Sequence, residues 1–374
     1  MTRPEESETF GLTVEERVAR ARADLRIGAP IALVSGSGGA LVVAAETIGA
    51  GRLVQLRALG PAALDLAVSH RRADTLRARA YDGLLARVVL DDGATEDWVL
   101  ATADPSRDLA TPLKGPYRTR REGPADLHAL ALMLTKQARL LPAAVVAVWE
   151  EAEAVRRIAA RAGLAELSEI MVRRAAEGPV RLRRVSAARV PTRFAAAGRV
   201  HVFRPDDGGE EHYAVETGQP DRRQPVLARL HSACFTGDVL ASLKCDCGPQ
   251  LAAAMKQIAE AGAGVLLYMN QEGRGIGLAN KMRAYALQDQ GFDTVEANHR
   301  LGFEDDERDF RLGAEMLKML GFSGVRLMTN NPKKVVTMEA SGLHVAERVP
   351  LQVGRTPENA AYLAVKAAKS GHLL

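Results

Sequence analysis

The sequence predicts an α/β (α+β) fold made of two mixed α/β domains, residues 1–180 and 181–374. A chain of 374 residues is long for a single hydrophobic core, so two domains are the first expectation. Strand-like apolar runs alternate with helical patterns, which is typical of α/β layers. The stretch EGPVRLRRV (177–185) contains a Gly-Pro pair that breaks a helix, and we place the joint between the domains there.

The first domain begins with an amphipathic helical pattern, VEERVARARADLRIG (14–28). A buried strand is expected next, over PIALVSGSGGALVVAAE (30–46). A loop punctuated by Pro and Gly follows at about 104–124, and two helical patterns span about 124–140 and 149–177.

The second domain is more sharply patterned. Helices are expected at 254–262, 280–291, 308–321 and 332–342, and buried strands at 264–270 and 325–330. Pro332 marks the start of the last helix and Gly342 its end. The stretch QEGRGIGL (271–278) reads as a glycine-rich turn.

The composition indicates a soluble globular protein, because 47% hydrophobic and 26% charged residues argue against disorder. The first residues, MTRPEESETF, lack the apolar region of a secretory signal. The apolar run LLPAAVVAVW (140–149) is about half the length that a membrane-spanning helix needs. We therefore expect a cytoplasmic protein with no membrane partner.

The net charge of +4 is small for this length. Arginines gather at 173–193, where a solvated linker face is favoured over a surface that binds nucleic acid or phosphate. Few aromatic residues lie between these arginines, so stacking on single strands is not expected. Nucleic acid is therefore not an expected partner.

All three cysteines, Cys234, Cys245 and Cys247, lie within one short segment. A disulfide is disfavoured in a cytosolic chain with an odd number of thiols, whereas free buried cysteines are the general alternative. Three thiolates without a fourth cysteine match catalytic zinc, which keeps one position open for water. His231 is an alternative fourth ligand that would close the site. With water in the open position, zinc lowers its pKa to about 7, so the pattern favours a hydrolytic centre.

Nearby segments suit a polyanion. Arg229 precedes the cysteines, Arg274 lies among the three glycines of QEGRGIGL, and Lys333 and Lys334 fall in the first turn of a helix. The acidic stretch GFEDDERDF (302–310) is interpreted as a helix start with carboxylates in its first turn. The alternative is that a carboxylate there holds an arginine or accepts a proton.

Six strings together resemble GTP cyclohydrolase II over roughly half the chain, from RVSAARVPT (184–192) to the terminal GHLL. They are HSACFTGDVLASLKCDCGPQL, QEGRGIGL, KMRAYALQDQGFDTVEANHRLGF, DERDF, TNNPKK and ERVPL. The resemblance implies hydrolysis of GTP to 2,5-diamino-6-ribosylamino-4(3H)-pyrimidinone 5′-phosphate, formate and pyrophosphate, the first step of riboflavin biosynthesis. It also implies a homodimer, one Zn²⁺ per subunit, and Mg²⁺ accompanying the triphosphate of GTP.

The resemblance assigns roles residue by residue. Cys234, Cys245 and Cys247 match zinc ligands, with zinc-bound water attacking C8 of guanine. Arg308 matches a proposed nucleophile at the α-phosphorus, Asp306 its proton acceptor, and Tyr285 a tyrosine that assists ring opening. A phosphate-clamping role for Arg308 stays open, because guanidinium is effectively always protonated. The positions that match GTP contacts are Arg229, Leu230, His231, Ser232, Ala233, Gln250, Glu272, Gly273, Arg274, Thr294, Thr329 and Lys334.

One position departs from the family pattern: members often carry Glu immediately before the first cysteine, where this chain has Ala233. Any side-chain contact of that glutamate is missing here, whereas backbone contacts are not affected.

Residues 17–49 resemble the start of 3,4-dihydroxy-2-butanone-4-phosphate synthase, a family often fused in front of this cyclohydrolase. The family's acidic, magnesium-binding stretch is replaced by VSGSGGA (34–40), which supplies no carboxylate. GPADLHALAL (123–132) stands where a GHTEA-like segment is expected, and His128 is assigned to an ordinary helix. We expect a degenerate domain without synthase activity.

Two other functions remain for the second domain. A zinc nucleobase deaminase also uses cysteine-bound zinc, but it carries H-x-E and P-C-x-x-C patterns that CDC does not fit. A non-catalytic regulator that binds GTP or nucleic acid is the other, and the intact set of cysteines with Tyr285, Asp306 and Arg308 argues against it.

Overall fold

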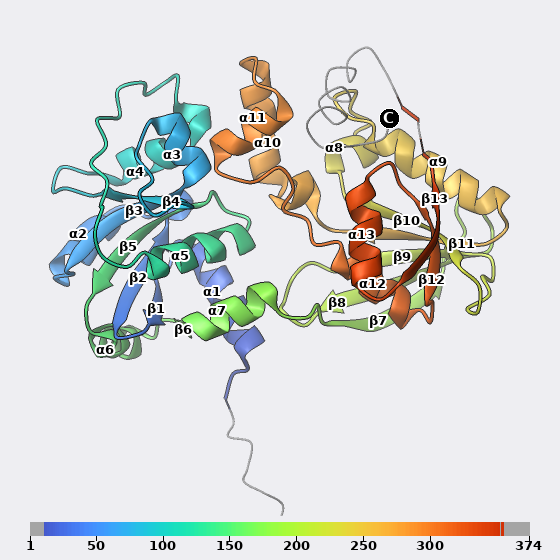
Figure 1. Ribbon diagram of the computed structural model, residues 1–374, viewed down its shortest axis with the longest axis horizontal. Coiled ribbons are helices and arrows are strands. Elements are labelled where there is room, and N and C mark those ends of the chain that lie inside the picture. Colours follow the sequence, from blue (N-terminus) through green and yellow to red (C-terminus); the bar gives the residue numbers. More distant parts are fainter. Residues whose placement is uncertain (1–10, 352, 355–374) are drawn as a thin grey trace, which may run out of the picture.

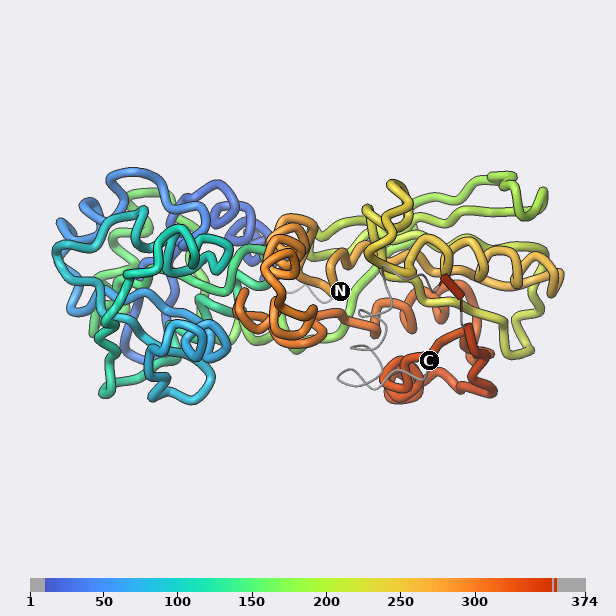
Figure 2. The backbone as a smooth tube through the Cα atoms, turned by 90° about the horizontal axis from the view of Figure 1, so that it is seen from above, coloured from blue at the N-terminus to red at the C-terminus, as the bar shows by residue number. Residues whose placement is uncertain are grey.

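The computed structural model describes residues 11–351 and 353–354 and confirms the α/β class, with two mixed sheets side by side along the long axis (Figures 1 and 2). The first sheet has the strand order β4-β3-β5-β2-β1-β6, and the second β13-β12-β10-β11-β9-β8-β7. We call residues 11–178 the first half and residues 179–354 the second half. The sequence MTRPEESETF and the terminal GHLL lie outside the described residues.

The first half opens with α1 (Val14–Arg26), whose start is fixed by a capping box between Thr13 and Glu16. The expected single strand over 30–46 is wrong, because the chain reverses within it. β1 (Ile31–Ser35) and β2 (Gly38–Ala44) pair as an antiparallel hairpin. Gly36 takes a φ of +56° in the turn, a conformation that glycine adopts at little cost.

Helices cover both faces of this sheet (Figure 1). The helix expected at 124–140 is α5 (Asp126–Gln137), and the pattern over 149–177 splits into α6 (Ala152–Ala162) and α7 (Glu169–Glu177) around the short strand β6 (Glu166–Ser168). The other elements are η1 (Ala45–Thr47), α2 (Arg52–Ala58), β3 (Ala63–Ser69), α3 (His70–Leu76), β4 (Leu85–Val89), α4 (Glu96–Ala103), η2 (Pro105–Arg107) and β5 (Ala143–Trp149).

Parallel and antiparallel strands meet in the second sheet. β10 (Val226–Ser232) lies between β11 (Gly264–Met269) and β12 (Gly324–Met328) and runs parallel to both, and β13 (His344–Val349) continues the parallel part. Three antiparallel strands that the sequence patterns did not indicate complete the sheet: β7 (Leu182–Arg189), β8 (Gly198–Pro205) and β9 (His212–Thr217).

The helices of the second half are α8 (Phe235–Asp238), α9 (Cys247–Glu260), η3 (Glu272–Gly275), α10 (Leu278–Asp289), α11 (Thr294–Leu301), α12 (Arg311–Met319) and α13 (Pro332–Ala340). The four expected helices are present as α9, α10, α12 and α13, whereas α8 and α11 were not predicted. Because α12 begins only at Arg311, residues 302–310 form a loop. The interpretation of their carboxylates as the first turn of a helix is therefore wrong.

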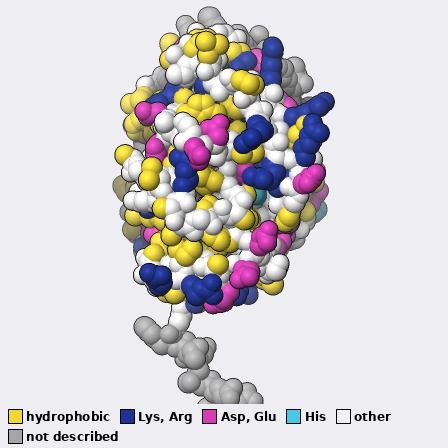
Figure 3. Space-filling model, turned by 90° about the vertical axis from the view of Figure 1, so that its left-hand side faces the viewer, with side chains coloured by type: hydrophobic (Ala, Val, Ile, Leu, Met, Phe, Trp, Pro, Cys, Tyr) yellow, Lys and Arg dark blue, Asp and Glu magenta, His cyan; other side chains and the backbone are white. Residues whose placement is uncertain are grey.

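The arginines of the 173–193 cluster lie on the surface, mostly beside carboxylates. Arg173 pairs with Glu169, and Arg174 and Arg181 both approach Glu15. At the outer end of the first half, basic and acidic side chains share the surface (Figure 3). Within the described residues, no helix combines the length and the apolar character needed to cross a membrane.

Candidate active site

The candidate site lies where three neighbouring parallel strands of the second sheet, β11, β10 and β12, end. Ser232 closes β10, Asn270 follows β11, and Thr329 follows β12. Since parallel neighbours end at the same edge, their following loops converge there, as ligand sites in open α/β sheets do. The cysteine segment follows β10, the glycine-rich turn follows β11, and the TNNPKK segment follows β12.

The three cysteines converge although they come from different ends of the loop. Their sulfur atoms all lie within 4.8 Å of one another, and the Sγ atoms of Cys234 and Cys245 are 3.6 Å apart. Two thiolates on one tetrahedral zinc, at Zn–S distances of about 2.3 Å, lie about 3.8 Å apart. A Cβ at Gly237 would stand 2.8 Å from the Cys245 Sγ, so only glycine leaves room for the cluster. The donor set fits a zinc ion.

The three thiols shift one another's pKa values. Hydrogen bonds from Cys245 and Cys247, and then the charge of Lys281, lower the pKa of Cys234. The pKa values of Cys245 and Cys247 are both raised, first by their contacts with the Cys234 sulfur. One thiolate therefore forms more readily than the other two, and a cation beside the cluster would favour ionisation of all three.

Asp238, which the sequence patterns did not single out, anchors this loop. Its carboxylate accepts hydrogen bonds from the Cys234 backbone N–H at 3.0 Å and from the Tyr268 hydroxyl at 2.9 Å. It also contacts His231 Nε2 at 3.0 Å. Burial lowers the pKa of His231, against the effect of Asp238. Among the described residues, the group of side chains close enough to share a metal ion contains the three cysteines and not His231, which argues against His231 as the fourth ligand.

A second unanticipated group, Lys281 on α10, sits beside the metal centre. Its Nζ lies 3.1 Å from the Cys234 Sγ, 2.8 Å from the Thr236 hydroxyl and 2.9 Å from the Glu272 carboxylate. Burial alone would lower the pKa of Lys281, but Glu272 and Cys234 outweigh it and raise the pKa. Its fixed positive charge offsets part of the negative charge of the thiolates.

The other side of the cavity is basic and buried. Arg229 donates to the Met328 carbonyl at 3.0 Å and to the Gln250 side chain at 2.5 Å, whereas its Nε has no hydrogen-bond partner among the described residues. Burial lowers the pKa of Arg229 to about 10, so it keeps its charge at neutral pH. Lys334 donates to the Leu230 carbonyl at 2.8 Å from the first turn of α13. Two buried cations on one wall form a surface that suits an anionic group such as phosphate.

The glycine-rich turn adopts an unusual backbone. Gly273 and Arg274 have φ values of +64° and +62°, and Gly275 and Gly277 also have positive φ. The left-handed conformation is costly for Arg274, and such strain concentrates at ligand sites. A Cβ at Gly275 would lie 2.6 Å from the Glu307 carbonyl, so glycine lets this turn pack on the 302–310 loop.

Asp306 and Arg308 form a bidentate pair on that loop, at 2.6 and 2.7 Å. Burial would raise the pKa of Asp306, but Arg308 outweighs it and lowers the pKa. Arg308 also donates to the Ser232 hydroxyl at 3.3 Å and stacks on Phe310. The Asp306 carboxylate therefore fixes the Arg308 guanidinium at the cavity wall. This agrees with the alternative for residues 302–310, in which a carboxylate holds an arginine.

The sequence-predicted positions are brought together. Asp306 lies behind the wall and acts on the cavity through Arg308, and the other positions line one cavity. These lining residues are Arg229, Leu230, His231, Ser232, Ala233, Cys234, Cys245, Cys247, Gln250, Glu272, Gly273, Arg274, Tyr285, Thr294, Arg308, Thr329 and Lys334.

The corresponding features of the first half do not form such a site. VSGSGGA forms the β1–β2 turn, and His128 lies on α5, as expected, buried with its Nε2 3.3 Å from Asp65. Arg120 pairs with the same carboxylate at 2.9 Å. Asp65 is thus held in a buried ion pair, and no cluster of metal-ligating side chains is found in the described part of this half.

A thiol cluster that fits a metal ion, beside a buried basic cavity, is an arrangement typical of metal-dependent enzymes that act on anionic substrates. The sequence model of GTP cyclohydrolase II matches residues 183–350. A GTP cyclohydrolase-2 of Azospirillum brasilense is 44% identical over 95% of this chain and 93% of its own length. One of Cronobacter sakazakii is 58% identical over 52% of this chain and 98% of its own length. The chain is an enzyme of the GTP cyclohydrolase II family.

A solved two-domain 3,4-dihydroxy-2-butanone 4-phosphate synthase of A. baumannii covers 90% of this chain and 99% of its own, at 16% identity and a TM-score of 0.32. This likeness is too weak to assign the first half to that family.

We expect Asp238→Ala to lower the free energy of unfolding by about 3 kcal/mol, because unsatisfied buried polar groups cost about 1–3 kcal/mol each. Urea unfolding in the presence of a chelator measures this without a contribution from metal binding. Asp206→Ala, which removes a half-exposed carboxylate 3.7 Å from Arg183, is the control and should change the value by less than about 0.5 kcal/mol. Wild-type stability of Asp238→Ala would refute the anchoring role.

Proposed function

We propose that this protein is a zinc-dependent GTP cyclohydrolase II that converts GTP to 2,5-diamino-6-ribosylamino-4(3H)-pyrimidinone 5′-phosphate, formate and pyrophosphate in riboflavin biosynthesis. The observation that carries the proposal is the placement of the three-cysteine cluster and the buried basic groups on one cavity. Family membership supports the substrate class, because the matched region contains every residue of that cavity.

Cys234, Cys245 and Cys247 are the proposed zinc ligands. Zinc held by three thiolates supplies, when bound, a water of lowered pKa that suits hydrolysis of the guanine ring. Burial raises the pKa of Tyr285 to about 12, so its hydroxyl stays protonated and can donate a hydrogen bond on this side of the cavity. Lys281 holds Glu272 and Thr236 in place around the cluster.

The basic side of the cavity is the proposed triphosphate site, with Mg²⁺ accompanying GTP. Arg229 carries an unpaired, inward N–H, and Lys334 brings a second buried cation. The glycine-rich turn brings Gly273 and the charged Arg274 to the same cavity wall. Gln250, Thr294 and Thr329 supply neutral hydrogen-bonding groups in the same cavity.

For Arg308 we propose a phosphate clamp rather than a nucleophile. A nucleophilic guanidinium must first lose a proton, and the available acceptor is Asp306. Arg308 itself lowers the pKa of Asp306, so this carboxylate is a weak base. A protonated, bidentate-held guanidinium is suited to bind a phosphate and stabilise its developing charge.

For the first half we propose a degenerate synthase domain, residues 1–180, joined to a cyclohydrolase domain, residues 181–374. The hairpin turn over VSGSGGA offers no carboxylate to a magnesium ion. Purified protein should make no dihydroxybutanone phosphate from ribulose 5-phosphate, and detection of that product would overturn the assignment. A homodimer in the cytoplasm remains the expected state of the enzyme.

Zinc-loaded protein incubated with GTP and Mg²⁺ should release formate and pyrophosphate and form a diaminopyrimidine. Cys245→Ser should lower formate release by more than about 100-fold, since even outer-shell changes cost 10–100-fold at metal sites. Ser242→Ala, on the same loop, is the matched control and should behave like wild type. Formate release from Cys245→Ser at the wild-type rate would remove the zinc assignment. Absence of both products from the wild type would favour the non-catalytic regulator.

The clamp predicts that charge at position 308 matters more than guanidinium chemistry. Arg308→Lys should release pyrophosphate at least about 10-fold faster than Arg308→Met, because the ammonium still stabilises phosphate charge. Steady-state kinetics of pyrophosphate release measure both variants at matched zinc content. Equal inactivity of the two variants would instead support a nucleophilic guanidinium.

A further inference from the structure

The wall of the candidate site is also the contact surface between the two halves. α10 and α11 lie between the two sheets in both views (Figures 1 and 2). α11 packs against α3, and α10 packs against η2. α10 carries Lys281 and Tyr285, and α11 begins at Thr294. Any shift of these helices on the first half is therefore a shift of groups that line the GTP cavity.

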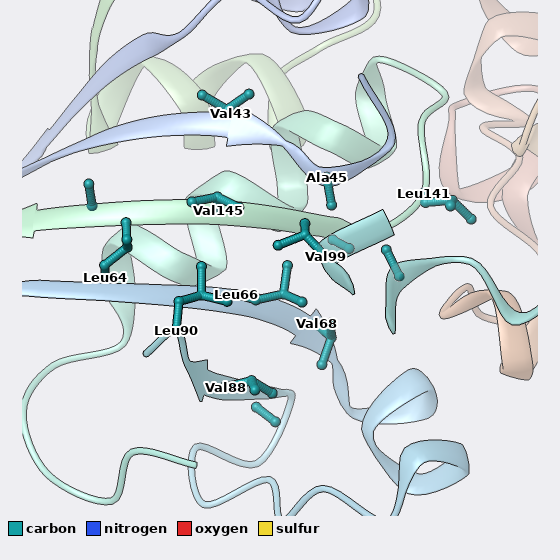
Figure 4. Packing of buried hydrophobic residues seen from close by; sticks show 14 of the residues in the cluster. Val43, Ala45, Leu64, Leu66, Val68, Val88, Leu90, Val99, Leu141 and Val145 are labelled. Atoms are coloured by element: carbon teal, nitrogen blue, oxygen red, sulfur yellow. The ribbon is translucent and has the colours of Figure 1, made fainter. Parts of the chain in front are cut away.

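One hydrophobic cluster spans both halves. The core of the first sheet contains Leu66, Val145 and Leu141, and Leu141 lies on the side that the second half approaches (Figure 4). The same cluster includes six buried residues of the second half: Ile276, Ala284, Leu287, Ala297, Leu301 and Phe303. Buried apolar contacts of this kind hold the two halves at a fixed spacing.

Buried polar contacts fix the orientation as well. Arg283 of α10 pairs with Glu46 at 3.0 Å and with Asp104 at 3.2 Å in the first half. The neighbouring Asn280, fully buried, donates to the Arg139 carbonyl at 3.1 Å. Directional bonds at several points of α10 leave little freedom for the helix to rotate.

Lys136, at the end of α5, reaches the loop that holds the phosphate-clamping arginine. Its Nζ lies 2.7 Å from the Glu307 carboxylate, between Asp306 and Arg308 in the sequence. The Glu307 backbone N–H donates to the Arg274 carbonyl at 2.9 Å. The ion pair between Lys136 and Glu307 therefore connects the first half to the 302–310 loop, which carries Arg308. Through the Glu307 backbone it also reaches the glycine-rich turn, which carries Arg274.

Arg139 makes the parallel contact to the start of the glycine-rich turn. Its Nη2 donates to the Asn270 carbonyl at 2.9 Å, and its Nη1 pairs with Glu210 at 2.8 Å. Its φ of +58° is unfavourable for a residue other than glycine. A strained residue persists where the surrounding contacts hold it, and these contacts lie in the second half.

We propose that the first half is a positioning element of the GTP site, in which Lys136 and Arg139 fix the 302–310 loop and the glycine-rich turn in their binding geometry. The kinetic test of this inference rests on the proposed function, because it measures the release of pyrophosphate from GTP. The C. sakazakii relative is matched almost end to end by 195 residues of this chain, so it is too short to contain both halves. The fold of the site therefore does not require a first half, and the expected effect is a graded loss.

The kinetic test uses the full chain with a double-mutant cycle. Lys136→Met and Glu307→Gln should each lower kcat for pyrophosphate release by about 10- to 100-fold, because small misplacements at a reacting centre cost this much. The double variant should be no slower than either single variant, and Lys136→Arg should keep most of the activity. Zinc content should be unchanged in all of them.

Arg139→Gly separates positioning from stability. Glycine relieves the strain at a φ of +58°, which offsets part of the stability lost with the contacts to Asn270 and Glu210, so this variant should fold and melt within a few degrees of wild type while kcat falls. Arg22→Ala is the matched control, because Arg22 pairs with Asp207 across the same two halves but away from the cavity. Arg22→Ala should keep wild-type kcat. Wild-type activity of both Lys136→Met and Arg139→Gly, or independent effects in the cycle, would overturn the proposal.

Hydrogen exchange distinguishes this proposal from the proposed function. Lys136→Met and Arg139→Gly should speed amide exchange within 270–280 and 302–310 relative to Arg22→Ala. If the wild type releases neither product from GTP, the proposed function fails, and faster exchange in those segments still supports positioning. Unchanged exchange in both segments would overturn positioning whatever the reaction.

Discussion

Mutual repulsion among three thiolates is the constraint around which the site is built. Their sulfurs lie within 4.8 Å of one another, and the Cys234 sulfur raises the pKa values of the other two thiols. A cation in their midst would therefore favour full ionisation, and zinc has the matching preference for sulfur. Gly237 makes the space, Asp238 holds the loop, and Lys281 adds a fixed positive charge at the edge. Removing the cation would leave this arrangement without its organising charge.

The two sides of the cavity differ in charge. The cysteine side fits a metal ion, whereas the opposite side holds the buried cations Arg229 and Lys334, which suit an anionic ligand. A ligand with a hydrolysable ring at one end and phosphates at the other satisfies both sides. Arg308, fixed by Asp306, stands at the wall between the two.

Much of the second half was predictable because its signals are local. The cysteine spacing, the glycine-rich turn and Pro332 each act within a few residues, and the structure brings them to one edge of the sheet. The roles of Asp238 and Lys281 could not be predicted, because they depend on partners that are distant in the sequence. The strand β7 was not predictable in this way, since it is exposed at the sheet edge and lacks an alternating pattern. In the first half, a hairpin turn inside an apolar run was read as continuous strand.

The first half shows no cluster of metal-ligating side chains among its described residues, yet it contacts two segments that line the candidate site. Several of its carboxylates pair with cations of the same half, as the buried Asp65 does with Arg120. Its hydrophobic core continues into the second half. A domain that shares its core with its neighbour cannot drift independently, so its contacts become part of the cavity's geometry.

The central claim, a three-thiolate zinc site with one open position, is tested most directly by zinc K-edge X-ray absorption on the purified protein. We predict three sulfur ligands at about 2.3 Å and one lighter ligand at about 2.0–2.2 Å without the outer-shell signature of an imidazole. Four sulfur ligands, an imidazole signature, or zinc bound through oxygen and nitrogen alone would contradict the account.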